Sequence, residues 1–149
     1  MKVTIQAINL IKHFEGFRAC TYRCPAGIKT IGYGTTNPRY AKDGATVTQA
    51  EAERILAADL VVYEIAVSQL LKGHIVKQAR FDALVCFTYN VGLHALKNST
   101  LLKKYLAGDV NGAAQEFYRW NKANGKELQG LTRRRKAEAH LFITGEFKI

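Results

Sequence analysis

Residues 15–35, with the sequence EGFRACTYRCPAGIKTIGYGT, carry a carboxyl group on Glu15, a thiol on Cys24 and a hydroxyl on Thr30 that could share one reaction. Cleavage of a glycosidic bond needs a proton donor at the leaving oxygen, and commonly a second acidic group near the oxocarbenium-like centre. A carboxyl group in the last turn of a helix meets the negative end of the helix dipole, which favours the protonated form of a donor. Glu15 is therefore a candidate proton donor, although a Glu before a Gly is more often a solvated residue at a helix end.

The elements around this segment should hold the three groups in place. Apolar residues at helical spacing predict a helix over residues 3–14, and Gly16 is a typical helix stop. The period then changes towards two over residues 17–33, and the Cys-Pro-Ala-Gly sequence at 24–27 predicts a turn between two short strands. Residues 35–47 are rich in polar residues, Gly and Pro, and are expected to form a loop.

The rest of the chain is expected to be helical. The sequence Thr-Gln-Ala-Glu at 48–51 is a capping box, which predicts a long helix to about residue 71 with a length of about 35 Å at 1.5 Å per residue. Further helices are predicted over 77–91, from Ser99 or Thr100 to Gly108, from Asp109 to Arg119, and over 131–144, with a polar loop at 121–130. We therefore expect one α+β domain over residues 1–149. It would have a hairpin lobe (about 15–47), a connecting helix (about 48–72) and a helical lobe (about 74–149), with a ligand site in the cleft between the lobes.

The composition limits the possible partners and chemistry. The formal net charge is +10 and the sequence pI is about 9.7, so the protein should attract polyanions such as nucleic acid, anionic lipid or acidic cell-wall polymers. The three cysteines are an odd number, which excludes a complete disulfide framework. No signal peptide and no run of about 20 apolar residues is apparent. The four histidines show no metal-ligand spacing, and neither a metal nor a cofactor is expected.

A set of motifs in order along the chain resembles phage-type lysozymes, glycoside hydrolase family 24. It begins with HFEGFR at 13–18 and TIGYG at 30–34, and continues with FDALV at 81–85, YNVG at 89–92, NSTLL at 98–102, AGD at 107–109, WNK at 120–122, GL at 130–131 and RRRKAE at 133–138. A single motif of this kind would be weak, whereas the ordered set covers nearly the whole chain. The resemblance implies a lysozyme-like fold.

The same resemblance implies roles for the three groups of the opening segment. The family's site combines a Glu, an Asp nine positions later and a Thr six positions after that. Glu15 and Thr30 match, as the general acid and the residue that helps to hold the attacking water, but Cys24 stands where the Asp is expected. A second departure is Thr35, which stands where the family often has a His, so an ion pair that uses this His is absent.

The thiol of Cys24 has three possible roles. A free thiol has a pKa of about 8.5, and the nearby Arg18, Arg23 and Lys29 could lower it. A thiolate could act as a base towards water and give inversion, or attack the anomeric carbon and give retention. In the third case Cys24 is a passive substitution, and the other two groups suffice. An inactivating disulfide with Cys20 can be imagined, but two cysteines on one strand usually have unsuitable geometry.

Residues for substrate binding follow from the resemblance alone. Tyr89 and Asn90 match an aromatic–amide pair, in which Tyr89 could stack on a sugar or simply pack in the core and Asn90 could bond an N-acetyl group. Thr36 and Thr100 match other saccharide contacts, with Ser99 as the alternative if the register slips by one. Arg134 lies in a basic run that resembles a cluster facing the anionic peptide stems, although such runs are more often solvated.

Taken together, the resemblance implies an endolysin, a muramidase that hydrolyses the β-1,4 bond between N-acetylmuramic acid and N-acetylglucosamine in peptidoglycan. It would act as a monomer, without nucleic acid, and stay in the host cytoplasm until a separate export or holin route releases it. A lytic transglycosylase and a non-catalytic basic module that binds nucleic acid or the cell surface are the alternatives. The basic helix at 131–144 could also perturb an anionic outer membrane.

Overall fold

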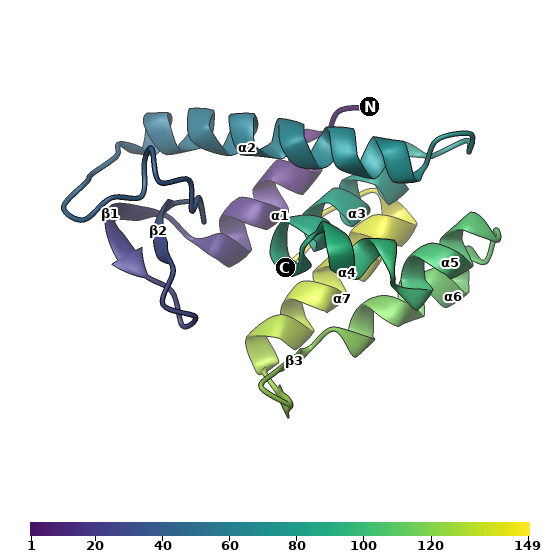
Figure 1. Cartoon of the computed structure of the whole chain (residues 1–149). Helices are drawn as coiled ribbons and strands as arrows, with labels where there is room; N and C mark the ends of the chain where they lie inside the picture. The colour runs from purple at the N-terminus through teal and green to yellow at the C-terminus, as the bar shows by residue number, and fades with distance from the viewer. The chain divides into compact units, whose positions relative to one another are not determined.

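The computed structural model describes all residues, 1–149, and has the α+β composition that the sequence predicts (Figure 1). The elements in order are α1 (Ile5–Glu15), β1 (Arg18–Arg23), β2 (Lys29–Gly32), α2 (Gln49–Leu70), α3 (Gln78–Val91), α4 (Leu93–Lys97), α5 (Thr100–Leu106), α6 (Val110–Glu116), η1 (Phe117–Arg119), β3 (Lys122–Ala123), β4 (Lys126–Glu127) and α7 (Gln129–Thr144). No helix is both long enough and apolar enough to span a bilayer.

The chain divides into two compact units. One, here called the hairpin unit, is continuous and comprises residues 11–62. The other, here called the helical unit, comprises residues 1–10 and 63–149. The boundaries fall inside α1 and α2, so these two helices each contribute residues to both units.

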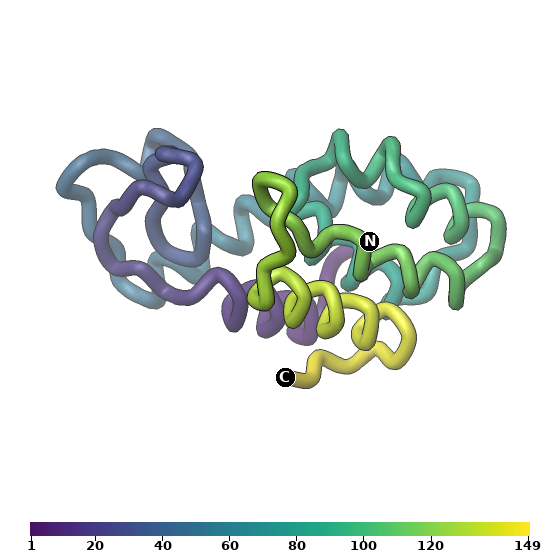
Figure 2. Tube along the Cα trace, turned by 90° about the horizontal axis from the view of Figure 1, so that it is seen from below, coloured from purple at the N-terminus to yellow at the C-terminus, as the bar shows by residue number.

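Strands β1 and β2 of the hairpin unit pair antiparallel around the predicted turn. The pairs Arg23–Lys29 and Tyr22–Thr30 flank this turn, and the ladder is irregular between Arg18 and Tyr22. The following loop, residues 33–48, folds back along β1, since the backbone N–H of Thr21 donates to Ala45 O at 3.2 Å. Figure 2 follows the chain from α1 through the hairpin and this loop into α2.

The predicted capping box opens α2. The backbone N–H of Glu51 donates to Thr48 Oγ1 at 3.1 Å, and the backbone N–H of Thr48 donates to Glu51 Oε1 at 2.9 Å. These reciprocal bonds satisfy two backbone donors at the start of the helix that would otherwise lack partners. The pKa of Glu51 is lowered, because the carboxylate accepts the backbone and side-chain hydrogen bonds of Thr48.

The core of the helical unit is built around α3. Its residues 81–88 are all buried, and α3 packs most extensively against α7. Two carboxylates of this unit hold the residues before α1: Asp82 accepts the backbone N–H of Thr4 at 3.1 Å, and Glu64 accepts that of Val3 at 2.6 Å. Near the other end of the chain, the backbone N–H of Phe147 donates to Gln6 Oε1 at 2.8 Å.

The structure corrects three element predictions. Residues 93–97 form a helix, α4, that was not predicted, and α7 begins at Gln129 rather than at 131. The predicted polar loop 121–130 contains the hairpin β3–β4. Its turn holds Asn124 at φ 52° and Gly125 at φ 77°, and an Asn-Gly pair is the usual choice for a two-residue hairpin turn that needs two positive φ angles. The signal was therefore present in the sequence.

Candidate active site

Glu15 is the last residue of α1 and is half-buried. The helix ends there because Gly16 adopts φ 71°, a left-handed conformation that glycine reaches without steric cost. The carboxyl group lies directly over Gly34, where a Cβ atom would come within 2.7 Å of Glu15 Oε1. The sequence thus placed Glu15 correctly at the helix end, and the structure adds its contact with the hairpin unit's glycine-rich segment.

Cys24 follows β1 and opens the turn to β2. The backbone N–H of Gly27 donates to Cys24 O at 2.7 Å, and the backbone N–H of Cys24 donates to Ile28 O at 2.9 Å. Gly27 has φ 80°, which lets the chain reverse within four residues. This tight turn points backbone N–H groups back towards the sulfur.

These N–H groups lower the pKa of the Cys24 thiol. The largest cause is the hydrogen bond from the backbone N–H of Ile28 to the sulfur. Smaller contributions come from the N–H of Ala26 and from the hydroxyl of Thr30, and partial desolvation opposes them. Donors that point at a thiolate stabilise the charged form and so increase its population at neutral pH.

The three neighbouring cations that could have lowered this pKa are not among its causes. Each of them interacts with another group. Arg23 donates to Gly27 O at 3.0 Å, Lys29 pairs with Asp43 at 3.0 Å, and Arg18 lies 4.3 Å from the centre of the Tyr22 ring. The turn backbone, rather than the basic side chains, provides the stabilisation.

Thr30 lies on β2 next to Cys24 and is 4% exposed. Its hydroxyl donates to Ile28 O at 3.0 Å, and it can also donate to the Cys24 sulfur, where it favours the thiolate. A hydroxyl has one proton and two lone pairs, so the same group can accept a hydrogen bond from water while its proton is engaged. The structure therefore brings two of the three predicted groups, Cys24 and Thr30, close enough for the hydroxyl to influence the thiol.

The second cysteine near the turn does not form a disulfide with Cys24. All three cysteines of the chain are free, and Cys20 is exposed in the middle of β1. Four residues of strand span about 13 Å at 3.3 Å per residue. Disulfide geometry allows at most about 7 Å between Cα atoms. The imagined Cys20–Cys24 bridge is thus incompatible with the folded hairpin.

Thr35, at the position where a His was expected, faces Asp59 of α2. The pKa of Asp59 is raised by burial, and the nearby Thr35 hydroxyl partly opposes this change. Thr35 Oγ1 is itself buried without a hydrogen bond of normal geometry. At this position a neutral hydroxyl therefore stands beside a half-buried carboxyl group, in place of the His that the family often has.

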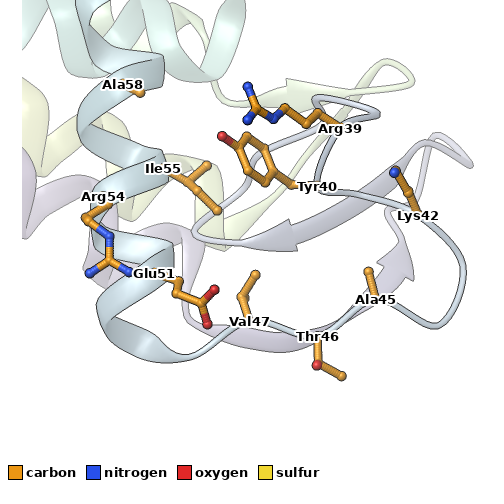
Figure 3. Close-up of a pocket in the computed structure, with 10 residues that line it drawn as sticks. All are labelled: Arg39, Tyr40, Lys42, Ala45, Thr46, Val47, Glu51, Arg54, Ile55 and Ala58. Atoms are coloured by element: carbon orange, nitrogen blue, oxygen red, sulfur yellow. The ribbon is translucent and has the colours of Figure 1, made fainter.

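Two hollows of about 430 Å³ lie on the hairpin unit. Thr36, a predicted saccharide contact, is exposed and lines one of them together with Arg23 and Lys29. Figure 3 shows the residues that line the other, which include Arg39 from the loop and Arg54 from α2. None of the three predicted catalytic residues lines either hollow, but both hollows carry basic side chains.

The other predicted saccharide contacts lie in the helical unit. Asn90 is exposed near the end of α3, and its Oδ1 accepts a hydrogen bond from Arg135 Nη2 at 2.6 Å, which leaves the amide NH₂ as its donor group. Tyr89 is half-buried and packs edge-on against Tyr63, with 5.3 Å between the ring centres. Thr100 is exposed at the first position of α5.

Ser99, the alternative to Thr100, has a structural role. It is buried, its hydroxyl accepts the backbone N–H of Leu102 at 3.0 Å, and it donates to Leu96 O at 2.7 Å. This is the hydrogen bonding of a helix N-cap. Thr100 is thus the one of the two residues that solvent can reach.

The structure removes Arg134 from the candidate substrate contacts. Its side chain is 4% exposed and pairs with Glu138, with 3.2 Å between Arg134 Nε and Glu138 Oε2. The neighbouring Arg135 is also buried, whereas Arg133 and Lys136 are exposed. In this basic run, Arg134 and Arg135 are therefore buried in an ion network, whereas Arg133 and Lys136 face solvent.

Two features of the candidate site were not predicted from the sequence. The first is the set of backbone N–H groups around the Cys24 sulfur, of which the Pro-Ala-Gly turn was the only trace. The second is the contact of Glu15 with Gly34, for which the GYG sequence at 32–34 suggested only a bend or a close backbone approach.

Comparisons with known proteins identify the family to which the chain is similar. The phage lysozyme family model matches residues 12–138. The endolysin of Bacillus phage B103 is 45% identical over 153 residues, and the match covers 99% of this chain but only 56% of that protein. The chain therefore spans little more than half the length of this relative.

Solved structures show the same similarity. An endolysin from Escherichia coli O157:H7 phage FAHEc1 is 36% identical with a TM-score of 0.89, and the match covers 100% of this chain and 98% of that one. The muramidase domain of SpmX from Asticaccaulis excentricus is 38% identical with a TM-score of 0.88, over 96% of this chain and 98% of that one. The lysozyme-like fold is thus confirmed, and the chain belongs to the phage lysozyme family.

Proposed function

We propose that the protein is a muramidase that hydrolyses the β-1,4 bond between N-acetylmuramic acid and N-acetylglucosamine in peptidoglycan, and that it acts as an endolysin in host lysis. The observation that carries the proposal is the hairpin unit's set of reactive groups. It combines a carboxyl group at a helix end with a thiol whose pKa is lowered by turn N–H groups and by the nearby buried hydroxyl of Thr30. Membership of the phage lysozyme family supports the same reaction.

In this proposal Glu15 gives its proton to the oxygen of the leaving sugar. As the glycosidic bond breaks, positive charge develops at the anomeric carbon and ring oxygen, and an anion nearby lowers the energy of that state. The Cys24 thiolate supplies this negative charge, and Thr30 accepts a hydrogen bond from the water that completes hydrolysis. The released proton then returns to the carboxylate of Glu15 or passes to solvent.

Two routes are open to the thiolate. As a base, it takes a proton from the water held at Thr30, and the product has the inverted configuration. As a nucleophile, it forms a C–S bond to the anomeric carbon while the leaving sugar takes the proton of Glu15, and water then cleaves that bond with net retention. The anomer that forms first in the digest distinguishes these routes.

The pH dependence of the rate tests the thiolate. Replacing Cys24 with Asp, the residue that the family resemblance implies, should move the acidic limb of the rate profile to lower pH, because a carboxyl group ionises near pH 4 and a thiol ionises at a higher pH even when its pKa is lowered. Cys24→Ser should lose at least about tenfold in rate, because a serine hydroxyl does not ionise in this range. We would measure initial rates of wall digestion from pH 4 to 9.

Cys20→Ser is the matched control, since it removes a nearby thiol, from β1, and leaves the turn that holds Cys24 intact. Its profile should coincide with that of the unmodified protein. If Cys24→Ser also kept the full rate and an unchanged profile, the sulfur would have no chemical role.

Three of the residues predicted to contact the saccharide are exposed, and we propose that they bind the substrate. Thr36 in the hairpin unit, and Asn90 and Thr100 in the helical unit, are exposed and can each bond a sugar hydroxyl or an N-acetyl group. Asn90 presents its NH₂ group because Arg135 holds the amide oxygen. We propose that the protein works as a monomer and reaches the wall by an export route that another protein provides.

Salt should slow the attack on intact walls. The net charge of +10 attracts an anionic polymer, and the screening length falls from about 10 Å at 0.1 M salt to about 3 Å at 1 M. We expect the lysis rate to fall severalfold between about 0.05 and 0.5 M NaCl. Cleavage of an uncharged chitin oligosaccharide is the control, and its rate should change little. Equal salt sensitivity of both substrates would contradict electrostatic capture.

The proposed function is tested most simply by the turbidity of purified peptidoglycan. The protein should clear a suspension that contains no membrane, lipid or nucleic acid, and soluble saccharides should appear as the turbidity falls. Binding without clearing would overturn the proposal in favour of a non-catalytic wall-binding module.

A further inference from the structure

Gly34 lies beneath the carboxyl group of Glu15. A Cβ atom built on Gly34 would sit 2.7 Å from Glu15 Oε1, 3.2 Å from its Cδ and 3.4 Å from its Cγ. Real Cβ atoms do not approach other heavy atoms within 3.0 Å, so any side chain at position 34 would compete with the carboxyl group for the same space. The contact thus involves the reactive end of Glu15.

The backbone that carries Gly34 is fixed. Ile31 and Thr35 exchange two backbone hydrogen bonds of 3.0 Å, which close the bend on both sides of Gly34. Between them Tyr33 is buried, and its hydroxyl accepts a hydrogen bond from Gln49 Nε2 at 3.0 Å. These contacts leave the bend little freedom to move away from Glu15.

The backbone of Glu15 is fixed as well. The last turn of α1 is closed by the backbone N–H of Gly16, which donates to Lys12 O at 3.0 Å. Since both backbones are held, a side chain at position 34 would displace the flexible part of the contact, which is the carboxyl group of Glu15.

We propose that Gly34 is a positioning residue for Glu15, because its missing side chain leaves the space in which the carboxyl group lies. This inference rests on the proposed role of Glu15 as proton donor. Displacing a catalytic group by about 1 Å can reduce a rate by about a hundredfold. Any side chain at position 34 should therefore reduce turnover by moving the donor away from the leaving oxygen.

Backbone strain must be separated from this effect, since Gly34 has φ 91°. Gly44 is a matched control in the same unit. It has φ 77°, and a Cβ atom there would meet nothing within 4 Å. An alanine at either position has a similar conformational cost, but only an alanine at position 34 would clash with the Glu15 side chain. Asn tolerates left-handed backbone better than Ala, so Gly34→Asn and Gly44→Asn form a second pair with less strain.

The experiment compares kcat, KM and melting temperature for both pairs on soluble peptidoglycan fragments. Gly34→Ala and Gly34→Asn should lose about ten- to a hundredfold in kcat with KM within about twofold of the unmodified protein. Gly44→Ala and Gly44→Asn should keep kcat within about twofold, with similar losses of melting temperature at the two positions. If the Gly34 and Gly44 variants had equal kcat values, the inference would be wrong.

A double variant shows whether Gly34 acts through Glu15. Adding Gly34→Ala to Glu15→Gln should reduce the residual rate by less than about twofold, because the displaced group is no longer a proton donor. A further tenfold loss would mean that Gly34 acts on something else. If the unmodified protein did not cleave peptidoglycan at all, the proposed function would be wrong. The result that would overturn the role of Gly34 is different: the unmodified protein is active, and the Gly34 and Gly44 variants have equal kcat values.

Discussion

Replacing Glu15 with Gln should abolish cleavage of peptidoglycan almost completely, with a loss of about 10²- to 10⁴-fold in rate. This range is what a positioned general acid contributes. Glutamine has nearly the same shape and can still hydrogen-bond, but it has no proton to give to the leaving sugar. The side chain lies over Gly34, and the amide fits the same space, so the fold and the affinity for walls should change little.

The control for Glu15→Gln is Glu53→Gln, which removes a carboxylate from the same unit but away from the hairpin turn. Glu53 pairs with Lys12 at 2.6 Å on an exposed surface, and such pairs contribute at most about 1 kcal/mol. Glu53→Gln should therefore keep nearly the full rate. Retention of more than about a tenth of the rate by Glu15→Gln, with normal melting behaviour, would remove Glu15 from the role of proton donor.

Replacing Glu138 with Gln should destabilise the protein by about 3–5 kcal/mol, the range for removing one partner of a buried ion pair. Glu138 is fully buried, and its carboxylate forms ion pairs with two guanidinium groups. The distances are 3.2 Å to Arg134 Nε and 2.9 Å to Arg135 Nε. The substitution would leave both positive charges in the core of the helical unit with less compensation.

Unfolding in urea would measure this loss of stability as a lower midpoint urea concentration for Glu138→Gln than for the unmodified protein. Glu127→Gln is the control, because Glu127 is exposed on β4 and its loss should change the free energy of unfolding by less than about 0.5 kcal/mol. A change below about 1 kcal/mol for Glu138→Gln would show that the core tolerates the two charges. Since Arg135 also holds Asn90, the destabilised variant should in addition bind wall fragments more weakly at temperatures where it remains folded.

Local sequence signals were sufficient to predict the elements that carry the reactive groups. The change from helical spacing to alternation, with Gly16 at the change, predicted the end of α1. The Cys-Pro-Ala-Gly turn predicted the hairpin, and the capping box predicted the start of α2, because each of these signals acts through neighbours within four residues. The Asn124–Gly125 turn had an equally local signal that was not used.

Contacts between distant residues could not be predicted in this way. A run of basic residues at 133–136 suggests a solvated face, and only the packing of α3 against α7 shows that Arg134 and Arg135 are buried. Likewise, the cations near Cys24 in sequence suggested a cause for its lowered pKa. The actual cause depends on the direction of the Ile28 N–H, which the turn conformation sets. The contact between Glu15 and Gly34 is likewise formed by the fold, and nothing in the local sequence predicts it.

The most direct test of the central claim is the mass of the products that the protein releases from purified peptidoglycan. Hydrolysis adds one water molecule at each cleaved bond, so the fragments should carry reducing N-acetylmuramic acid ends, and these should be absent from the Glu15→Gln digest. Fragments that are lighter by one water, with 1,6-anhydro ends, would show a lytic transglycosylase and would contradict the hydrolytic roles assigned to Glu15, Cys24 and Thr30.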